Sequence, residues 1–225
     1  MKHDGLVVLI SGRGSNAMAL VDAYARGVLP VPVHAVIADG LAPGLELAAA
    51  KGIDTAMVPR KAFPGRGTFE TALAEVISGF RPRLIALAGF MRVLSTGFVQ
   101  RHSGRLVNIH PSLLPKYRGL DTHSRALAAG DAVHGASVHW VTPDLDAGPV
   151  IAQAEVPIRE GDNAHILAER VLKQEHRLYP AALALLIANS VGVRYEKPDD
   201  RTSNHTPPVL DCDFDDAGRL LRAGR

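Results

Sequence analysis

Short apolar runs alternate, over the first half of the chain, with longer stretches in which apolar residues return every three or four positions. Each run is bounded by Gly, Pro or Asp, which is typical of strands that are buried on both faces of a parallel sheet. We predict strands at Leu6–Ile10, His34–Ala38, Thr55–Pro59, Leu84–Ala88 and Leu106–Ile109. We predict helices between them at Ala17–Ala25, Gly44–Lys51 and Thr68–Phe80. The alternation predicts an α/β fold with a mostly parallel sheet, helices on both faces and right-handed crossovers.

The pattern changes after the fifth strand. Ala136–Thr142 and Val150–Ile158 are separated by a loop and predict a β pair rather than another strand–helix unit. Ala164–Ile187 predicts a long amphipathic helix that Pro180 interrupts. From Val191 the chain is polar and rich in Pro, Asp and Arg. We therefore predict one domain over residues 1–190 and a loosely packed tail over 191–225.

Composition narrows the class of protein. The 225 residues are 47% hydrophobic and carry a formal net charge of +2, which gives little support for a nucleic-acid partner. No apolar run approaches the ~20 residues of a membrane span, and the first strand is too short for a secretory signal. Cys212 is the single cysteine, so an internal disulfide is excluded. We expect a cytoplasmic protein, a monomer or homodimer, that acts on small molecules and binds neither nucleic acid nor membrane.

A glycine-containing loop, Ser11–Asn16, joins the first strand to the first helix. Gly12 and Gly14 allow a close backbone approach, and Ser15 or Asn16 is expected to cap the helix. The free N–H groups at the start of a helix attract an anion. The loop therefore predicts a phosphate site.

The same loop has two other interpretations. The pattern Gly12-x-Gly14-x-x-Ala17 fits a dinucleotide fingerprint, with Asp39 at the end of the second strand as the ribose-binding acid. It is also compatible with a tight turn that binds nothing. The Gly-Ser-Asn ending favours a single phosphate over a pyrophosphate, and nothing later in the chain supports a nicotinamide. We therefore expect no NAD.

The chemistry is concentrated in three residues near the fifth strand. Asn108 and His110 are two positions apart, so in an extended strand their side chains point to the same side. An amide beside an imidazole can hold the oxyanion of a tetrahedral intermediate, and the imidazole can move a proton. Asp146, on a later Gly/Pro-bounded loop, would favour the charged form of His110. These are the groups needed to move an acyl group between two nitrogens.

Other chemistries find less support in the sequence. A lone histidine at a strand end is usually a packing residue. Six other histidines lack comparable neighbours, namely His102, His123, His134, His139, His165 and His176. No His/Cys arrangement has zinc-ligand spacing, so we expect no metal. Ser112 lacks the Gly-x-Ser-x-Gly elbow of a serine hydrolase.

At this point the sequence resembles the phosphoribosylglycinamide formyltransferase family. The matching segments run in the family's order over roughly the first 190 residues. They are Val8–Asn16, Leu87–Leu94, Asn108–Tyr117, His134–Gly135, Asp144–Pro149 and Gln174–His176. The resemblance implies a Rossmann-like formyltransferase fold that uses 10-formyltetrahydrofolate as co-substrate and glycinamide ribonucleotide as acceptor, in purine biosynthesis. It also implies direct attack of the acceptor amine on the formyl carbon.

The resemblance assigns roles residue by residue. The catalytic group would be Asn108, His110 and Asp146. The glycinamide ribonucleotide would be bound by Gly14, Ser15, Asn16, Leu172, Lys173, Gln174 and Glu175. The folate would be bound by Arg66, Met91, Arg92, Val93, Leu94, Asn108, Thr142, Pro143, Asp144, Leu145 and Asp146.

Plainer roles remain open for some of these residues. The segment Met91–Leu94 could be an apolar turn under the sheet, and Arg66 could serve solubility alone. Glu175 could be a solvated helix residue paired with Arg170 or Lys173.

The chain departs from the family pattern at two positions. Asp121 stands where some members have histidine, and Arg118 replaces a common proline. Asp121 puts an auxiliary histidine role there in doubt without affecting the catalytic three.

Three rival functions remain. A formyltetrahydrofolate deformylase typically carries an amino-terminal regulatory domain, whereas this sequence opens on its first strand. A methionyl-tRNA formyltransferase needs a basic carboxy-terminal RNA-binding domain, for which the tail is too small. A non-catalytic nucleotide-binding protein would need the glycine loop but not Asn108, His110 and Asp146 together.

Overall fold

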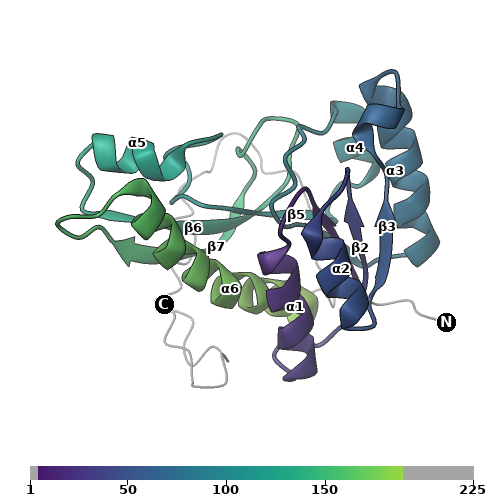
Figure 1. Cartoon of the computed structure of the whole chain (residues 1–225), viewed down its shortest axis with the longest axis horizontal. Helices are drawn as coiled ribbons and strands as arrows, with labels where there is room; N and C mark the ends of the chain where they lie inside the picture. Colours follow the sequence, from purple (N-terminus) through teal and green to yellow (C-terminus); the bar gives the residue numbers. More distant parts are fainter. Residues whose placement is uncertain (1–4, 190–225) are drawn as a thin grey trace.

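The fold is a single seven-stranded sheet covered by helices on both faces (Figure 1). The computed structural model describes residues 5–189. The strand order is β3-β2-β1-β4-β5-β6-β7. The strands are β1 (Leu6–Ile10), β2 (Val33–Ala38), β3 (Asp54–Met57), β4 (Leu84–Leu87), β5 (Leu106–His110), β6 (Val133–Trp140) and β7 (Val150–Pro157). The first five strands are parallel, while β6 is antiparallel to both of its neighbours.

The helices lie mainly between the parallel strands and after the last one. They are α1 (Ser15–Ala25), α2 (Pro43–Ala50), α3 (Arg66–Phe80), α4 (Thr96–Arg101), α5 (Thr122–Ala128) and α6 (Ala164–Asn189), with a 3-10 turn at Arg60–Ala62. Figure 1 shows α1, α2 and α6 on one side of the sheet and α3 and α4 on the other.

Alternation along the strands builds two cores. Leu6, Val8 and Ile10 of β1 face the core shared with α1 and α6, and Val7 and Leu9 face the core shared with α3 and α4. Every residue of β1 is buried, because helices cover both of its faces. The predicted fold class is confirmed, with boundaries that move by at most three residues at the predicted elements.

Three predictions about individual elements were incomplete or wrong. The strand near residue 55 is an edge strand with exposed residues, not one buried on both faces. Pro180 does not interrupt α6, because the buried Leu178, Tyr179 and Ala182 around it pack on the core and hold the helix together despite the missing N–H. The short helices α4 and α5 were not predicted at all.

The topology determines where a ligand binds. Strand order reverses between β1 and β4, and open α/β sheets bind ligands at the carboxyl ends of the strands at such a switch point. The loops that leave β1 and β4 are joined there: Ser11 N donates to the Gly89 carbonyl (3.1 Å), and Met91 N donates to Ser11 Oγ (2.8 Å). The glycine loop and the Met91–Leu94 segment therefore share one edge of the sheet.

Two further predictions concern the tail of the chain and the possibility of a membrane span. The predicted tail at 191–225 lies outside the described residues. Over residues 5–189, no helix has the length and apolar character needed to cross a membrane.

The buried imidazole of His102 makes the stability of the fold depend on pH. Burial, assisted by the neighbouring charges of Arg105 and Arg101, lowers the pKa of His102 from 6.5 to about 4. The unfolded chain therefore binds a proton that the folded protein does not, so the free energy of unfolding should fall as pH drops from 6.5 to about 4. Replacing His102 with Gln should flatten this fall in denaturant titrations. The exposed His165→Gln should leave the slope unchanged, and an equal slope in all three proteins would contradict the assignment.

Candidate active site

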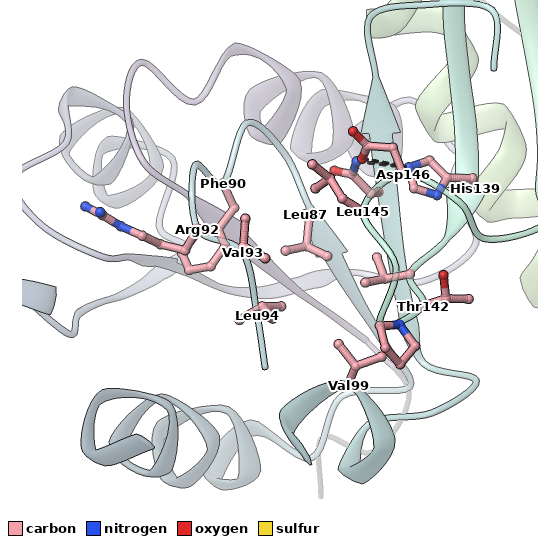
Figure 2. Close-up of a pocket in the computed structure, with 13 residues that line it drawn as sticks. Leu87, Phe90, Arg92, Val93, Leu94, Val99, His139, Thr142, Leu145 and Asp146 are labelled. Carbon is pink, nitrogen blue, oxygen red and sulfur yellow. Dashed lines mark hydrogen bonds and ion pairs between the residues drawn. The ribbon is translucent and has the colours of Figure 1, made fainter. Parts of the chain in front are cut away.

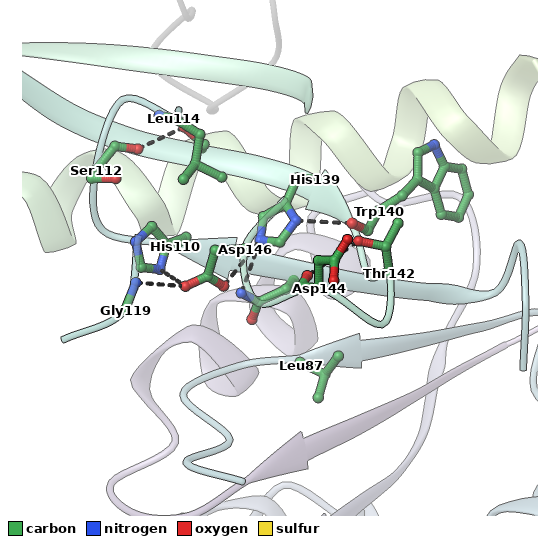
Figure 3. A network of polar contacts seen from close by, with 12 residues as sticks. Leu87, His110, Ser112, Leu114, Gly119, His139, Trp140, Thr142, Asp144 and Asp146 are labelled. Atoms are coloured by element: carbon green, nitrogen blue, oxygen red, sulfur yellow. Dashed lines mark hydrogen bonds and ion pairs between the residues drawn. The ribbon is translucent and has the colours of Figure 1, made fainter. Parts of the chain in front are cut away.

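The predicted catalytic side chains of His110 and Asp146 face each other at the carboxyl end of β5 (Figure 3), and the amide of Asn108 lies 3.1 Å from His139 Nε2 in the same place. Asn108 and His110 belong to β5, and Asp146 belongs to the loop between β6 and β7. Asp146 Oδ2 lies 3.4 Å from His110 Nδ1, with both side chains largely buried. The structure therefore brings the three together from separate elements, as the sequence predicts.

The Asp146 carboxylate is held on several sides. Its Oδ2 accepts a hydrogen bond from Gly119 N (2.9 Å), and its Oδ1 lies 3.7 Å from His139 Nε2. The residue adopts a left-handed backbone (φ 47°), which aspartate tolerates better than most residues. Two positions on, a Cβ at Gly148 would lie 1.8 Å from the Trp140 carbonyl oxygen, so this loop passes β6 more closely than a side chain would allow.

Both nitrogens of His110 face acceptors. Nδ1 faces the Asp146 carboxylate, and Nε2 donates to the main-chain carbonyl of Tyr117 (2.9 Å). Neither a carboxylate nor a carbonyl can donate a proton, so the doubly protonated imidazolium is the form that satisfies both partners. The geometry supports a positively charged His110 beside the amide of Asn108.

His139 belongs to this site, although the sequence analysis set it aside. Its Nδ1 donates to the Trp140 carbonyl (2.9 Å), and its Nε2 lies 3.1 Å from Asn108 Nδ2. Burial lowers the pKa of His139, which favours the neutral ring with its single proton on Nδ1. Nε2 then accepts from the Asn108 amide and fixes its orientation.

The role of His139 follows from the register between β5 and β6, which the structure gives. Asn108 of β5 pairs directly with His139 of β6 in the antiparallel ladder. The two predicted strands could have been aligned in principle, but the sequence does not set their register.

An apolar cavity of about 90 Å³ opens beside these groups (Figure 2). Eight of the predicted folate residues line it, together with Leu87 of β4, Val99 of α4, His139 of β6, and Phe90 and Val141, which follow β4 and β6. The eight are Arg92, Val93, Leu94, Asn108, Thr142, Pro143, Leu145 and Asp146. Of the predicted loop, Asp144 is not part of the lining, and its carbonyl accepts from Thr142 Oγ1 (3.2 Å).

A second cavity of about 240 Å³ adjoins the first and shares Arg92 and Val93 with it. Two of the three remaining predicted folate residues, Arg66 and Met91, line this second cavity. Arg66 is exposed at the first position of α3, rather than in a loop. The second cavity therefore presents arginine side chains close to an apolar one.

Asp39 is engaged by Arg92 and is not free to bind a ribose. Arg92 Nε donates to the buried Asp39 carboxylate, and Figure 2 shows the guanidinium extending away from Asp146 and His139. The alternative in which Asp39 serves a dinucleotide thus loses its acidic residue.

The glycine loop has the close backbone approach that was predicted, but a different helix cap. Gly14 is buried, has φ 71° and occupies the N-cap position of α1, with no side-chain cap. Ser15 and Asn16 lie inside the first turn, so the prediction that one of them caps the helix was wrong. A Cβ at Gly14 would lie 2.9 Å from Gly44 Cα, so a side chain there would be both strained and crowded.

Glu175 of α6 contacts this loop. Asn16 Nδ2 donates to Glu175 Oε2 (2.6 Å), and both side chains are buried. Burial raises the pKa of Glu175, while the bond from Asn16 acts in the opposite direction. Asn16 Oδ1 is also buried, and no hydrogen-bond partner for it occurs among residues 5–189. The alternative of a solvated Glu175 paired with Arg170 or Lys173 was wrong.

The other predicted residues of α6 are placed less tightly. Leu172 and Gln174 are half-buried, and Lys173 is exposed. In the part of the chain that the structure describes, none of the three makes a side-chain hydrogen bond or ion pair with the glycine loop. The same part holds no group of three or more His, Cys, Asp and Glu side chains arranged to bind a metal ion.

A doubly wound α/β sheet that carries an amide, an imidazole and a carboxylate beside its switch point has the groups that an acyl-transfer enzyme needs. Residues 5–183 match the family model described as formyl transferase. The chain belongs to the formyl transferase family.

Individual relatives refine this assignment. The chain is 48% identical over 180 residues to the phosphoribosylglycinamide formyltransferase of Escherichia coli K12, covering 80% of this chain and 85% of the relative. It is 42% identical over 191 residues to the human trifunctional purine biosynthetic protein adenosine-3, covering 84% of this chain but 19% of that protein.

Solved structures of formyltransferases have the same fold as this chain. A phosphoribosylglycinamide formyltransferase from Coxiella burnetii superposes with a TM-score of 0.79 at 48% identity, covering 84% of this chain and 88% of the other. A glycinamide ribonucleotide transformylase from Symbiobacterium toebii gives 0.82 at 39% identity, covering 86% and 92%.

Proposed function

We propose that the protein transfers the formyl group of 10-formyltetrahydrofolate to the amine of glycinamide ribonucleotide, a step of purine biosynthesis. The observation that carries this proposal is the meeting of Asn108, His110 and Asp146 at the mouth of the apolar cavity. The similarity to phosphoribosylglycinamide formyltransferases supports the choice of both substrates. No nucleic acid or membrane takes part in this reaction, and we place it in the cytoplasm, carried out by a monomer or homodimer.

The folate would enter the cavity between the segment after β4 and the loop before β7. Leu94 and Leu145 provide apolar walls for a flat ring system, and the main chain beside them offers polar groups at the edge. Arg66 and Arg92, in the adjoining cavity, suit the anionic tail of the co-substrate.

The ribonucleotide would occupy the glycine loop. Gly14 permits close backbone approach to a phosphate, and the start of α1 supplies free N–H groups. The buried Glu175 and Asn16 offer hydrogen-bond acceptors to sugar hydroxyls. Asn16 Oδ1, which has no hydrogen-bond partner among residues 5–189, would accept from a hydroxyl of the bound ribonucleotide. Ser11 N donates to the Gly89 carbonyl and Ser11 Oγ accepts from Met91 N, so this loop lies beside the segment to which we assign the folate.

The reaction then follows from the positions of the groups. The acceptor amine attacks the formyl carbon, and the carbonyl oxygen gains negative charge. The bond from that carbon to N10 of the folate then breaks, and the proton that the amine loses is transferred to N10, so that tetrahydrofolate leaves. Asn108 donates to the negatively charged oxygen through its free N–H, since His139 fixes its other N–H. The imidazolium of His110, held between the Asp146 carboxylate and the Tyr117 carbonyl, adds positive charge nearby. Holding both reactants in one crevice lowers the barrier further, by ~7–11 kcal/mol in favourable cases.

A direct assay tests the function. The protein is mixed with 10-formyltetrahydrofolate, and tetrahydrofolate formation is followed with and without glycinamide ribonucleotide. We expect product only when the ribonucleotide is present. Equal product without it would indicate hydrolysis, and formylation of methionyl-tRNA would indicate the tRNA-directed rival. No folate product under any condition would leave only a binding role, and the proposal would be wrong.

The phosphate site makes a separate prediction. Glycinamide riboside, which lacks the phosphate, should have a kcat/KM lower by about 10–100-fold, the value of one or two charge-assisted hydrogen bonds. Gly14→Ala should raise the KM for the ribotide in steady-state assays, because its Cβ crowds Gly44. Gly27→Ala is the matched control, since Gly27 is also left-handed (φ 74°) but faces open space. Equal kinetics for riboside and ribotide would show that the glycine loop does not bind the phosphate.

A further inference from the structure

Tyr117 has an unusual backbone conformation next to the catalytic histidine. Its φ is 56°, in the left-handed region, where an aromatic residue is rarely found. In this conformation its carbonyl accepts the hydrogen bond from His110 Nε2 (2.9 Å). Strained residues of this kind persist only when their surroundings hold them, and they gather at functional sites.

The Tyr117 side chain is anchored away from the site. Its hydroxyl donates to Asp131 Oδ2 (2.7 Å), and the Arg125 guanidinium lies 5.3 Å from the ring centroid. Asp131 also accepts from Lys116 Nζ at 3.0 Å on both oxygens. Asp131 follows α5 and precedes β6, so it ties the 116–117 segment to the start of the antiparallel part of the sheet.

The chain before Tyr117 is anchored to the sheet as well. Ser112 Oγ donates to the Lys116 carbonyl (2.6 Å), which closes the turn. Ser137 Oγ of β6 donates to the Ser112 carbonyl (2.6 Å) and accepts from Leu114 N (3.0 Å). Gln153 of β7 donates to the Leu114 carbonyl (2.9 Å). The segment between β5 and Tyr117 is therefore fixed at both ends.

We propose that Tyr117 is a positioning residue of the formyl transfer, clamped by Asp131 so that its left-handed backbone directs a carbonyl at His110 Nε2. The carbonyl sets the rotation of the imidazole and leaves Nδ1 facing Asp146. Without it, the ring could turn about its Cβ–Cγ bond, and either nitrogen could face the carboxylate. The proposal rests on the proposed function, because it concerns the same histidine.

A pair of substitutions separates the backbone from the side chain. Tyr117→Asn and Tyr117→Val both lose the ring and the hydroxyl, but asparagine accepts a left-handed backbone, whereas β-branched valine resists it. We expect kcat to fall by roughly 10–100-fold in Tyr117→Val, in keeping with the cost of misplacing a catalytic group, and by clearly less in Tyr117→Asn. KM for both substrates should stay close to wild type in each. Equal kcat in the two variants would overturn the proposal.

The clamp is tested by Asp131→Ala, which removes both carboxylate acceptors and also serves if Tyr117→Val fails to fold. Asp22→Ala is the matched control, because Asp22 forms another lysine ion pair (2.7 Å to Lys51 Nζ) on the surface. We expect kcat to fall in Asp131→Ala alone, with KM unchanged. An Asp131→Ala variant as active as Asp22→Ala would contradict the clamp.

A spectroscopic readout distinguishes this proposal from the proposed function. In protein labelled with ¹⁵N-histidine, the His110 signals, identified by their loss in His110→Gln, should show a proton on Nε2 in the wild type. They should move in Tyr117→Val more than in Tyr117→Asn. This readout needs no turnover, so an inactive wild type would refute the formyl transfer without deciding the role of Tyr117. Unmoved His110 signals in Tyr117→Val would refute that role.

Discussion

Replacing Asn108 with alanine is expected to lower kcat by roughly 10²–10³-fold, which is the usual cost of losing one donor to a developing oxyanion. The Asn108 amide is prepared for this role, because neutral His139 accepts one of its N–H groups and leaves the other for the substrate. His110→Ala is expected to fall in the same range, since it removes the positive charge beside the same oxygen. Steady-state rates of tetrahydrofolate release measure both effects.

The control for these variants is His165→Ala, whose imidazole is exposed on α6 and 82% accessible. It should retain wild-type turnover, and all three variants should unfold at similar denaturant concentrations. Near-wild-type kcat in Asn108→Ala or in His110→Ala would show that the residue concerned does not stabilise the transition state.

Much of the fold could be predicted because it depends on local patterns. Strands β1 and β4 are short apolar runs buried on both faces, and burial of that kind leaves a clear record in sequence. The break expected at Pro180 did not occur, because tertiary packing of α6 outweighs one lost hydrogen bond. Helix propensity alone does not show whether the packing of α6 or the hydrogen bond lost at Pro180 has the larger effect.

The active site likewise has some features that local sequence patterns predict and others that depend on tertiary contacts. Asn108 and His110 could be predicted to act together because two positions on one strand share a side. The contribution of His139 depends on the register of β5 against β6, and that of Tyr117 on a loop conformation held by Asp131. The engagement of Asp39 by Arg92 joins residues from different loops. Such long-range contacts leave no periodic signal in the sequence.

The Asp146→Asn variant is expected to lose turnover although the shape of the side chain is kept. The substitution removes the charge that faces His110 Nδ1. An amide placed there presents at best a neutral oxygen instead of a carboxylate, so His110 Nδ1 loses its charged acceptor. The imidazole is then held less well beside the oxyanion, and kcat should fall by roughly 10²-fold.

Steady-state kinetics of the wild type and Asp146→Asn decide this point. Asn can still accept from Gly119 N, so the loop should keep its position and the KM for folate should change little. An unchanged kcat with a raised KM for folate would show instead that Asp146 does not act through His110. Its role would then be to position the folate, through the same loop that passes β6 at Gly148.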